Sequence, residues 1–149
     1  MANIFNVAQH ILQKSGEISA WRLQNLCYYA QAWVLAQTGE PLFAEDFEAW
    51  SNGPVCRSMY RLIKNSPAVL PDDIPGDTQG NDFISEEQAN IIDHMLERYG
   101  KYQLFEFAKE HSKDHSPWKI GRGSRPNGML CGDIILKENI LDYFDQEIG

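Results

Sequence analysis

The chain has few cysteines and no long apolar run. Its three cysteines, Cys27, Cys56 and Cys131, are widely spaced along 149 residues and form no CxxC pair. This spacing argues against a zinc ribbon or a disulfide framework and favours free, buried thiols in a reducing compartment. No run of about 18 apolar residues occurs, so the sequence predicts no membrane span. Because no basic leader precedes an apolar segment at the N-terminus, we expect no signal peptide and a cytoplasmic protein.

Positive charge is also scarce. The sequence has 13 lysines and arginines against 21 aspartates and glutamates, which gives a formal net charge of −8 at pH 7. Nucleic-acid binding usually depends on a basic face that releases counterions from the phosphates. The chain is therefore a poor candidate for binding DNA or RNA, and no DNA partner is expected. Apolar side chains, by contrast, make up 43% of the residues and aromatic ones 11%, enough for the core of one domain.

Apolar residues recur at helical spacing over most of the chain, which predicts helices at about 2–14, 20–38, 86–99, 102–113 and 140–148. The helix at 20–38 is apolar on nearly all sides, so we expect it to be the central helix of the domain. Pro54 has the fixed φ that suits a helix start, and a helix is predicted to begin there. The triplet Ser116-Pro117-Trp118 predicts one more helical turn.

Three short segments predict a small sheet, at about 46–50, 82–84 and 132–135. Asn52-Gly53 predicts a turn after the first of them. Residues 66–82 and 121–132 are rich in proline, glycine or both, so we expect surface loops there. The predicted fold class is mainly α (α+β): a single compact helical domain over residues 1–149, with a small two- or three-stranded sheet.

Histidines and cysteines offer the only enzymatic hypotheses. His111 and His115 are four residues apart with Asp114 between them, a spacing that can place two metal ligands on one helix face. However, Ser112 follows His111 where an HExxH motif has glutamate, and no third ligand is evident. We expect His111 to make a hydrogen bond inside the fold, and we predict no metal and no cofactor. A cysteine nucleophile paired with His94 or His111 has no supporting spacing, and GxSxG, P-loop and GxGxxG motifs are missing.

One stretch of the chain is locally basic. Residues 101–125 carry six basic and three acidic side chains, a net charge of +3. Within this stretch, Arg122 and Arg125 lie among glycines, where two guanidinium groups can bind a phosphate or a carboxylate. The sequence leaves three interpretations open: a solvated loop, contact with an acidic protein surface, or binding of an anion or RNA.

Aromatic side chains exceed what a small helical core needs, and six of them stand out: Tyr28, Tyr29, Trp33, Trp50, Tyr60 and Trp118. Most of these belong in the core, and the remainder predict a protein-binding surface, where aromatic residues and arginine are enriched. For contact with a partner, the sequence favours Tyr29, Trp33, Trp50, Asn52, Gly53, Pro54, His111, Trp118, Arg122 and Arg125.

A series of short motifs resembles a known family. Residues 23–33 read LQNLCYYAQAW, and they are followed in order by GEPLF at 39–43, FEAW at 47–50, GPV at 53–55, His111, SPW at 116–118, Ile134 and YF at 143–144. This series resembles the Panacea domain of SocA-like antitoxins and GepA-like phage-associated proteins, over roughly residues 5–145. Asn25 stands where the family often has lysine, and Cys27 where it often has leucine. Either His111 or His115 matches the family's histidine.

The resemblance implies an antitoxin without catalytic activity. Such a protein binds and neutralises a protein toxin, often encoded by a neighbouring gene, or presents the toxin to a cellular protease as an adaptor. A net charge of −8 would speed its encounter with a basic toxin. The alternatives are a small metal-dependent hydrolase using His111 and His115, an RNA-binding module using Arg122 and Arg125, and a phage-associated protein with another host target. The sequence predicts no membrane partner and leaves the oligomeric state and the identity of the toxin open.

Overall fold

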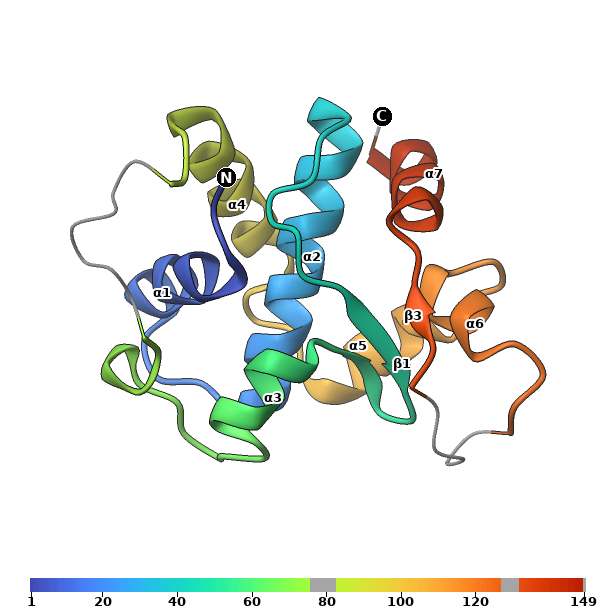
Figure 1. The fold of residues 1–149 in the computed structure, drawn as a ribbon, viewed down its shortest axis with the longest axis horizontal. Coiled ribbons are helices and arrows are strands. Elements are labelled where there is room, and N and C mark those ends of the chain that lie inside the picture. Colours follow the sequence, from blue (N-terminus) through green and yellow to red (C-terminus); the bar gives the residue numbers. More distant parts are fainter. Residues whose placement is uncertain (76–82, 127–131, 149) are drawn as a thin grey trace.

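Helices form most of the computed structural model, which describes residues 1–75, 83–126 and 132–148 (Figure 1). Over these ranges the helices are α1 (Ile4–Ser15), α2 (Ala20–Thr38), α3 (Arg57–Ile63), α4 (Glu86–Tyr99), α5 (Leu104–His111), α6 (Pro117–Arg122) and α7 (Lys137–Ile148), with a 3₁₀ helix at Pro71–Asp73. The strands are β1 (Phe47–Trp50), β2 (Gly53–Val55) and β3 (Ile134–Ile135). The fold is therefore mainly α with a small sheet, as the sequence predicted.

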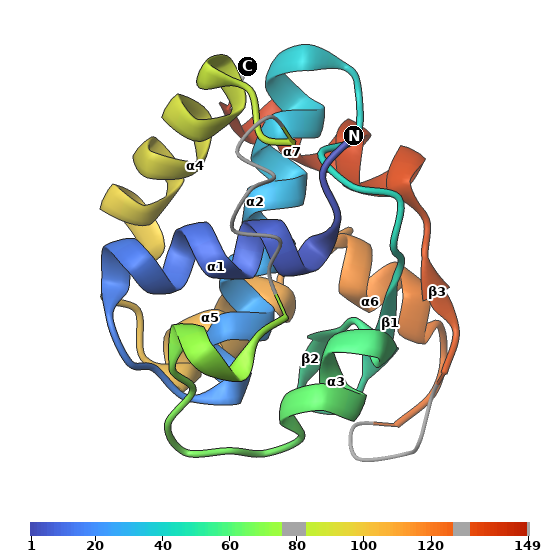
Figure 2. The same cartoon turned by 60° about the vertical axis from the view of Figure 1, so that its left-hand side comes forward.

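The long helix α2 is the centre of the fold. Its N-cap residue is Ser19, whose hydroxyl accepts a hydrogen bond from the backbone N–H of Arg22, and its C-cap residue is Gly39 in the left-handed conformation. Every residue from 23 to 35 is buried. Figure 2 shows α1 lying across α2, and α4 and α7 pack along it (Figure 1). The prediction of a central helix, apolar on nearly all sides, is confirmed.

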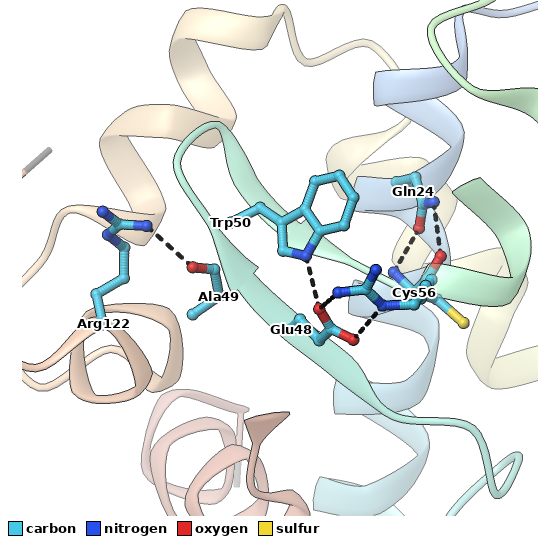
Figure 3. A network of polar contacts seen from close by, with 7 residues as sticks. Gln24, Glu48, Ala49, Trp50, Cys56 and Arg122 are labelled. Carbon is cyan, nitrogen blue, oxygen red and sulfur yellow. Dashed lines mark hydrogen bonds and ion pairs between the residues drawn. The ribbon is translucent and has the colours of Figure 1, made fainter. Parts of the chain in front are cut away.

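Two buried glutamines on α2 hold backbone segments from other parts of the chain. The side-chain amide of Gln31 accepts from the N–H of Leu42 at 2.7 Å and donates to the carbonyl of Phe43 at 2.8 Å. Seven residues earlier, Gln24 accepts from the N–H of Cys56 at 3.0 Å and donates to its carbonyl at 3.1 Å (Figure 3). Gln31 also accepts from the N–H of Phe43 at 3.4 Å. Each amide therefore satisfies backbone groups outside the strands and fixes a connecting segment against α2.

The sheet is antiparallel, with strand order β2-β1-β3, and it differs from the prediction in one strand. Residues 46–50 and 132–135 supply β1 and β3 as expected. The third strand, however, is β2 at 53–55, whereas residues 83 and 84 form no strand and residue 82 lies outside the described residues. Glu48 pairs with Val55 in β2 and with Ile134 in β3.

The predicted helix start at Pro54 is wrong. Pro54 lies in β2, and α3 begins three residues later at Arg57, with Cys56 as its N-cap residue. A proline fits this strand because β2 is at the edge of the sheet formed by the described residues, with β1 as its neighbour, so the missing N–H falls on that edge. Gly53, with φ of 131°, allows the chain to leave the turn directly into the strand.

Cys27 and Cys56 are buried free thiols, as predicted, and Cys131 lies outside the described residues. Burial raises the pKa of the Cys27 thiol, which keeps it protonated and unreactive. In the predicted loop at 66–82, the described part contains the 3₁₀ helix and a β-bridge between Ile18 and Val69.

Candidate functional site

A pocket of about 520 Å³ opens between the turn of the β1–β2 hairpin and the helices α2, α5 and α6. The hairpin turn contributes Ser51, Asn52 and Gly53 to its wall. The remaining lining residues come from the three helices: Trp21, Asn25, Leu104, Phe105, Ala108, His111, Trp118 and, just after α5, Ser112. Three parts of the chain that are distant in the sequence therefore meet at one opening: α2, the hairpin turn, and α5 with the neighbouring α6.

A histidine–asparagine pair forms the floor of this pocket. His111 Nε2 lies 2.7 Å from Asn25 Oδ1, while Asn25 Nδ2 donates to the carbonyl of Trp21 at 2.9 Å. Because the amide nitrogen is occupied by Trp21, the amide oxygen accepts from His111, which places the histidine proton on Nε2. Burial lowers the pKa of His111 to about 3, so the ring is neutral at physiological pH. The predicted internal hydrogen bond of His111 is confirmed.

The backbone of the hairpin approaches this pair closely. A Cβ atom at Gly53 would lie 3.6 Å from His111 Cδ2 and 3.8 Å from Asn25 Oδ1, which is ordinary van der Waals contact. The turn therefore packs against the floor of the pocket, and the φ of 131° at Gly53 is what favours glycine there. The hairpin, α2 and α5 are held in one arrangement, and the pocket is preformed.

The wall of the pocket that the start of α5 forms exposes large apolar side chains. Leu104 is 52% exposed and Phe105 is 71% exposed, both in the first turn of α5. The same helix buries Phe107 and His111 further along the chain. Exposed aromatic and aliphatic side chains beside a preformed pocket are typical of protein-binding sites.

The lining of the pocket contains no ionised group. Its polar groups are the neutral ring of His111, the amides of Asn25 and Asn52, and the hydroxyls of Ser51 and Ser112. Such a lining suits an apolar side chain of a partner with one or two neutral hydrogen bonds, and it offers no charge to a phosphate or a carboxylate.

The two histidines of the metal hypothesis do not come together as ligands. His111 is buried and bonded to Asn25, while His115 is exposed with φ of 67°. Within the described ranges, no group of three histidine, cysteine, aspartate or glutamate side chains is arranged to hold a metal ion.

The pocket brings together four of the residues favoured by the sequence: Asn52, Gly53, His111 and Trp118. Trp50 is half-buried beside them, and its carbonyl accepts a hydrogen bond from Trp118 Nε1 at 2.7 Å. The structure places the remaining candidates elsewhere. Tyr29, Trp33 and Pro54 are buried in the interior.

The two candidate arginines bind other parts of the chain. Arg122 is 2% exposed and donates to the carbonyls of Ala49 at 3.0 Å (Figure 3) and Pro126 at 2.8 Å. Arg125 is exposed and forms an ion pair with Asp133 at 2.8 Å. Arg122 therefore supports strand β1 from the interior, and of these two arginines only Arg125 reaches the surface.

Sequence reasoning missed part of the pocket. Leu104, Phe105 and Trp21 were given no binding role. The available signal was the adjacent apolar pair Leu104 and Phe105. Together with Phe107, these side chains form an apolar stripe that is wider than the one buried side of an eight-residue helix, so part of the stripe is exposed. Asn25 carried no signal of its own, since its partner lies 86 residues away.

The fold and the site define a mainly α protein with a small antiparallel sheet and an uncharged, largely apolar pocket beside it. A family model for the SocA-like antitoxin Panacea domain matches residues 23–119, and the chain belongs to this family. The matched residues include most of α2, the whole hairpin, α5 and every pocket residue except Trp21. Comparisons with curated proteins and with solved structures give no match. None of the helices in the described part of the chain is both long and apolar enough to cross a membrane.

Proposed function

We propose that this chain is an antitoxin that neutralises a protein toxin by binding it directly at the pocket between the hairpin turn and α5. The observation that carries the proposal is that a chain of an antitoxin family has a preformed, uncharged pocket within its family-matched segment. Neutralisation by binding needs no chemistry, only a stable interface of about 800 Å² on each partner. The toxin is the product of a neighbouring gene.

In this proposal, an apolar side chain of the toxin fills the pocket between Trp118 and Phe105. Burying such a side chain contributes about 1.5–3 kcal/mol, and the rigid walls lower the entropic cost of binding. The exposed amide of Asn52 lies on the rim, where it can form a hydrogen bond with the toxin backbone. Among the predicted contact residues, Asn52 and Arg125 have exposed side chains, and we retain these two at the edge of the interface.

One end of the molecule is locally acidic and contributes to the attraction of a basic toxin. Helices α4 and α7 together carry eight acidic and two basic side chains. They flank the C-terminal half of α2, whereas the pocket lies at its other end (Figure 1). Attraction at long range by this acidic end raises the association rate, and this rate falls as salt screens the charges. An association rate indifferent to ionic strength would contradict the steering.

Co-expression with the adjacent open reading frame tests the function. We expect the neighbour alone to arrest growth and this chain to restore it. Repeating the rescue in strains that lack the ATP-dependent proteases separates direct binding from delivery to a protease. Direct neutralisation predicts rescue in both strains, whereas rescue that requires the protease indicates an adaptor. A neighbour that is harmless alone, or toxic regardless of this chain, contradicts the proposal.

A further inference from the structure

The outer side of β1 carries a group of side chains that the pocket does not use. Glu48 accepts hydrogen bonds from Arg57 Nε at 2.9 Å and Nη2 at 2.7 Å, and from Trp50 Nε1 at 2.9 Å (Figure 3). The Arg57 guanidinium lies 5.6 Å from the centroid of the Trp50 ring. The centroids of the Trp50 and Tyr60 rings are 4.7 Å apart. The carboxylate thus fixes both an arginine and a tryptophan at the surface, so little side-chain freedom remains to be lost on binding.

Helix α3 adds positive charge to this group. Arg57, Tyr60 and Arg61 are spaced by three and four residues from Arg57, which places them on one side of α3. Lys64 is exposed and follows directly after the last residue of the helix. Arg61 is exposed, and its charge acts on the Glu48 carboxylate. Three cations against one carboxylate give a local charge of about +2, on a chain whose net charge is −8.

Apolar surface lies beside these cations. Ile134 pairs with Glu48 across β1 and β3 and is 48% exposed. Trp50 and Tyr60 are only half-buried, so their rings are partly accessible. Tryptophan, tyrosine and arginine are the residue types that dominate binding energy at protein interfaces.

We propose that this aromatic–arginine face, formed by Trp50, Arg57, Tyr60, Arg61 and Ile134, binds an acidic segment of a partner protein. Carboxylates of the segment pair with Arg57 and Arg61, and an apolar side chain between them packs on Trp50 and Ile134. This surface is separate from the pocket, because its contacts are made by side chains on the outer side of β1. It provides a second docking site and does not depend on the neutralisation proposed above.

A protein segment fits this face better than a nucleic acid does. Glu48 stands at its centre, so a ligand with a phosphate at every nucleotide meets more repulsion there than a peptide whose carboxylates are spaced by apolar residues. The net charge of −8 likewise opposes a densely charged polyanion more strongly than a peptide with a few carboxylates. An acidic peptide can instead alternate its carboxylates with apolar side chains, which matches cations interspersed with Trp50 and Ile134.

The test uses the full chain and a fluorescein-labelled peptide in which aspartate and glutamate alternate with leucine and phenylalanine. We expect binding to shift the indole N–H resonance of Trp50, identified by its loss in Trp50→Phe. Arg61→Glu is expected to weaken the affinity about tenfold, because it reverses a charge at the contact. Lys101→Glu, at the turn before α5, is the matched control, and it should change the affinity by less than about twofold. Phe105→Asp, in the pocket, should leave peptide binding unchanged.

Three results would overturn the proposal. One is an acidic peptide that leaves the Trp50 resonance in place, or that binds Arg61→Glu as tightly as the wild type. Another is a single-stranded oligonucleotide of equal charge that binds the face more tightly than the peptide, which would indicate a nucleic-acid site. The third is concentration-dependent self-association that Arg61→Glu abolishes, which would assign the face to a second copy of this chain.

Discussion

The aromatic cluster around Tyr29 and the aromatic side chains beside the hairpin consist of the same residue types in opposite surroundings. Tyr29 stacks on Tyr99 with ring centroids 4.1 Å apart and on Phe107 at 5.8 Å, and all three rings are at most 3% exposed. Near the hairpin, by contrast, Phe105 is 71% exposed and Trp50 is half-buried. The difference comes from enclosure: helices α4, α5 and α7 cover the first group and leave the second open. Aromatic content alone therefore does not distinguish a core from an interface.

His111 joins the two regions. Its ring stacks against Tyr29 with centroids 5.8 Å apart and lies 6.3 Å from the ring of Trp118 in the pocket wall. Its Nε2 bonds to Asn25 at the pocket floor. The closed cluster therefore supports the open site directly, which allows the comparison to be tested by changing one region at a time.

The largest effect is expected in the closed cluster. Tyr29→Ala removes a ring that is 2% exposed, and we expect it to lower the free energy of unfolding by about 3–5 kcal/mol. Trp50→Ala removes a half-buried ring and should cost less than half as much. Urea denaturation of both variants measures the difference, and equal losses would contradict the distinction between the regions.

The second largest loss of stability is expected at a buried side-chain amide. Gln31→Leu leaves the N–H of Leu42 and the carbonyl of Phe43 without their partner, and we expect a loss of about 2–4 kcal/mol in the free energy of unfolding. Gln37→Leu, at an exposed position of the same helix, is the control and should be nearly neutral. If the two variants were equally stable, the role of Gln31 in holding the segment after α2 would be refuted.

The pH dependence of stability reports on His111, at the junction of the regions. Its pKa is about 3 in the folded state and about 6.5 when unfolded, so unfolding takes up a proton between these values. The contribution to stability is complete above pH 6.5 and is lost as the pH falls. Between pH 7 and pH 5, the wild type should lose about 2 kcal/mol more than His111→Gln, measured by urea denaturation. The same pH dependence in both proteins would show that His111 titrates normally.

The smallest effect on stability is expected in the open region. Phe105→Asp replaces an exposed side chain in the first turn of α5, where an acidic residue suits the helix dipole. We expect the free energy of unfolding to change by at most about 0.5 kcal/mol. A loss of several times that amount, measured by thermal or urea denaturation, would place Phe105 in the core after all.

Much of the fold was predictable because its signals are local. Apolar periodicity located the main helices. Two of these helices, α2 and α4, are capped by Ser19 and Ser85, whose hydroxyls accept from backbone N–H groups three residues ahead. The Pro54 error has a local origin as well. Proline suits both a helix start and an edge strand, and only pairing with β1 decides between them.

The site was only partly predictable because its contacts are long-range. The sequence correctly identified His111 as an internal hydrogen-bonding residue, but Asn25, its partner, is a polar residue within an apolar helix and gave no sign of that contact. Tyr29 and Trp33 were favoured for binding on residue type alone, and the structure places both in the interior. Which aromatic side chains remain open is decided by how the helices pack, and no local pattern records it.

The most direct test of the account is growth rescue by a pocket variant that remains folded. The toxin from the neighbouring gene should be neutralised by the wild type and by Phe83→Asp, a matched change at an exposed phenylalanine outside the pocket. Phe105→Asp should fail to restore growth at the same protein level, because it places a charge where an apolar contact is required. Full rescue by Phe105→Asp would contradict the claim that the toxin binds at this pocket.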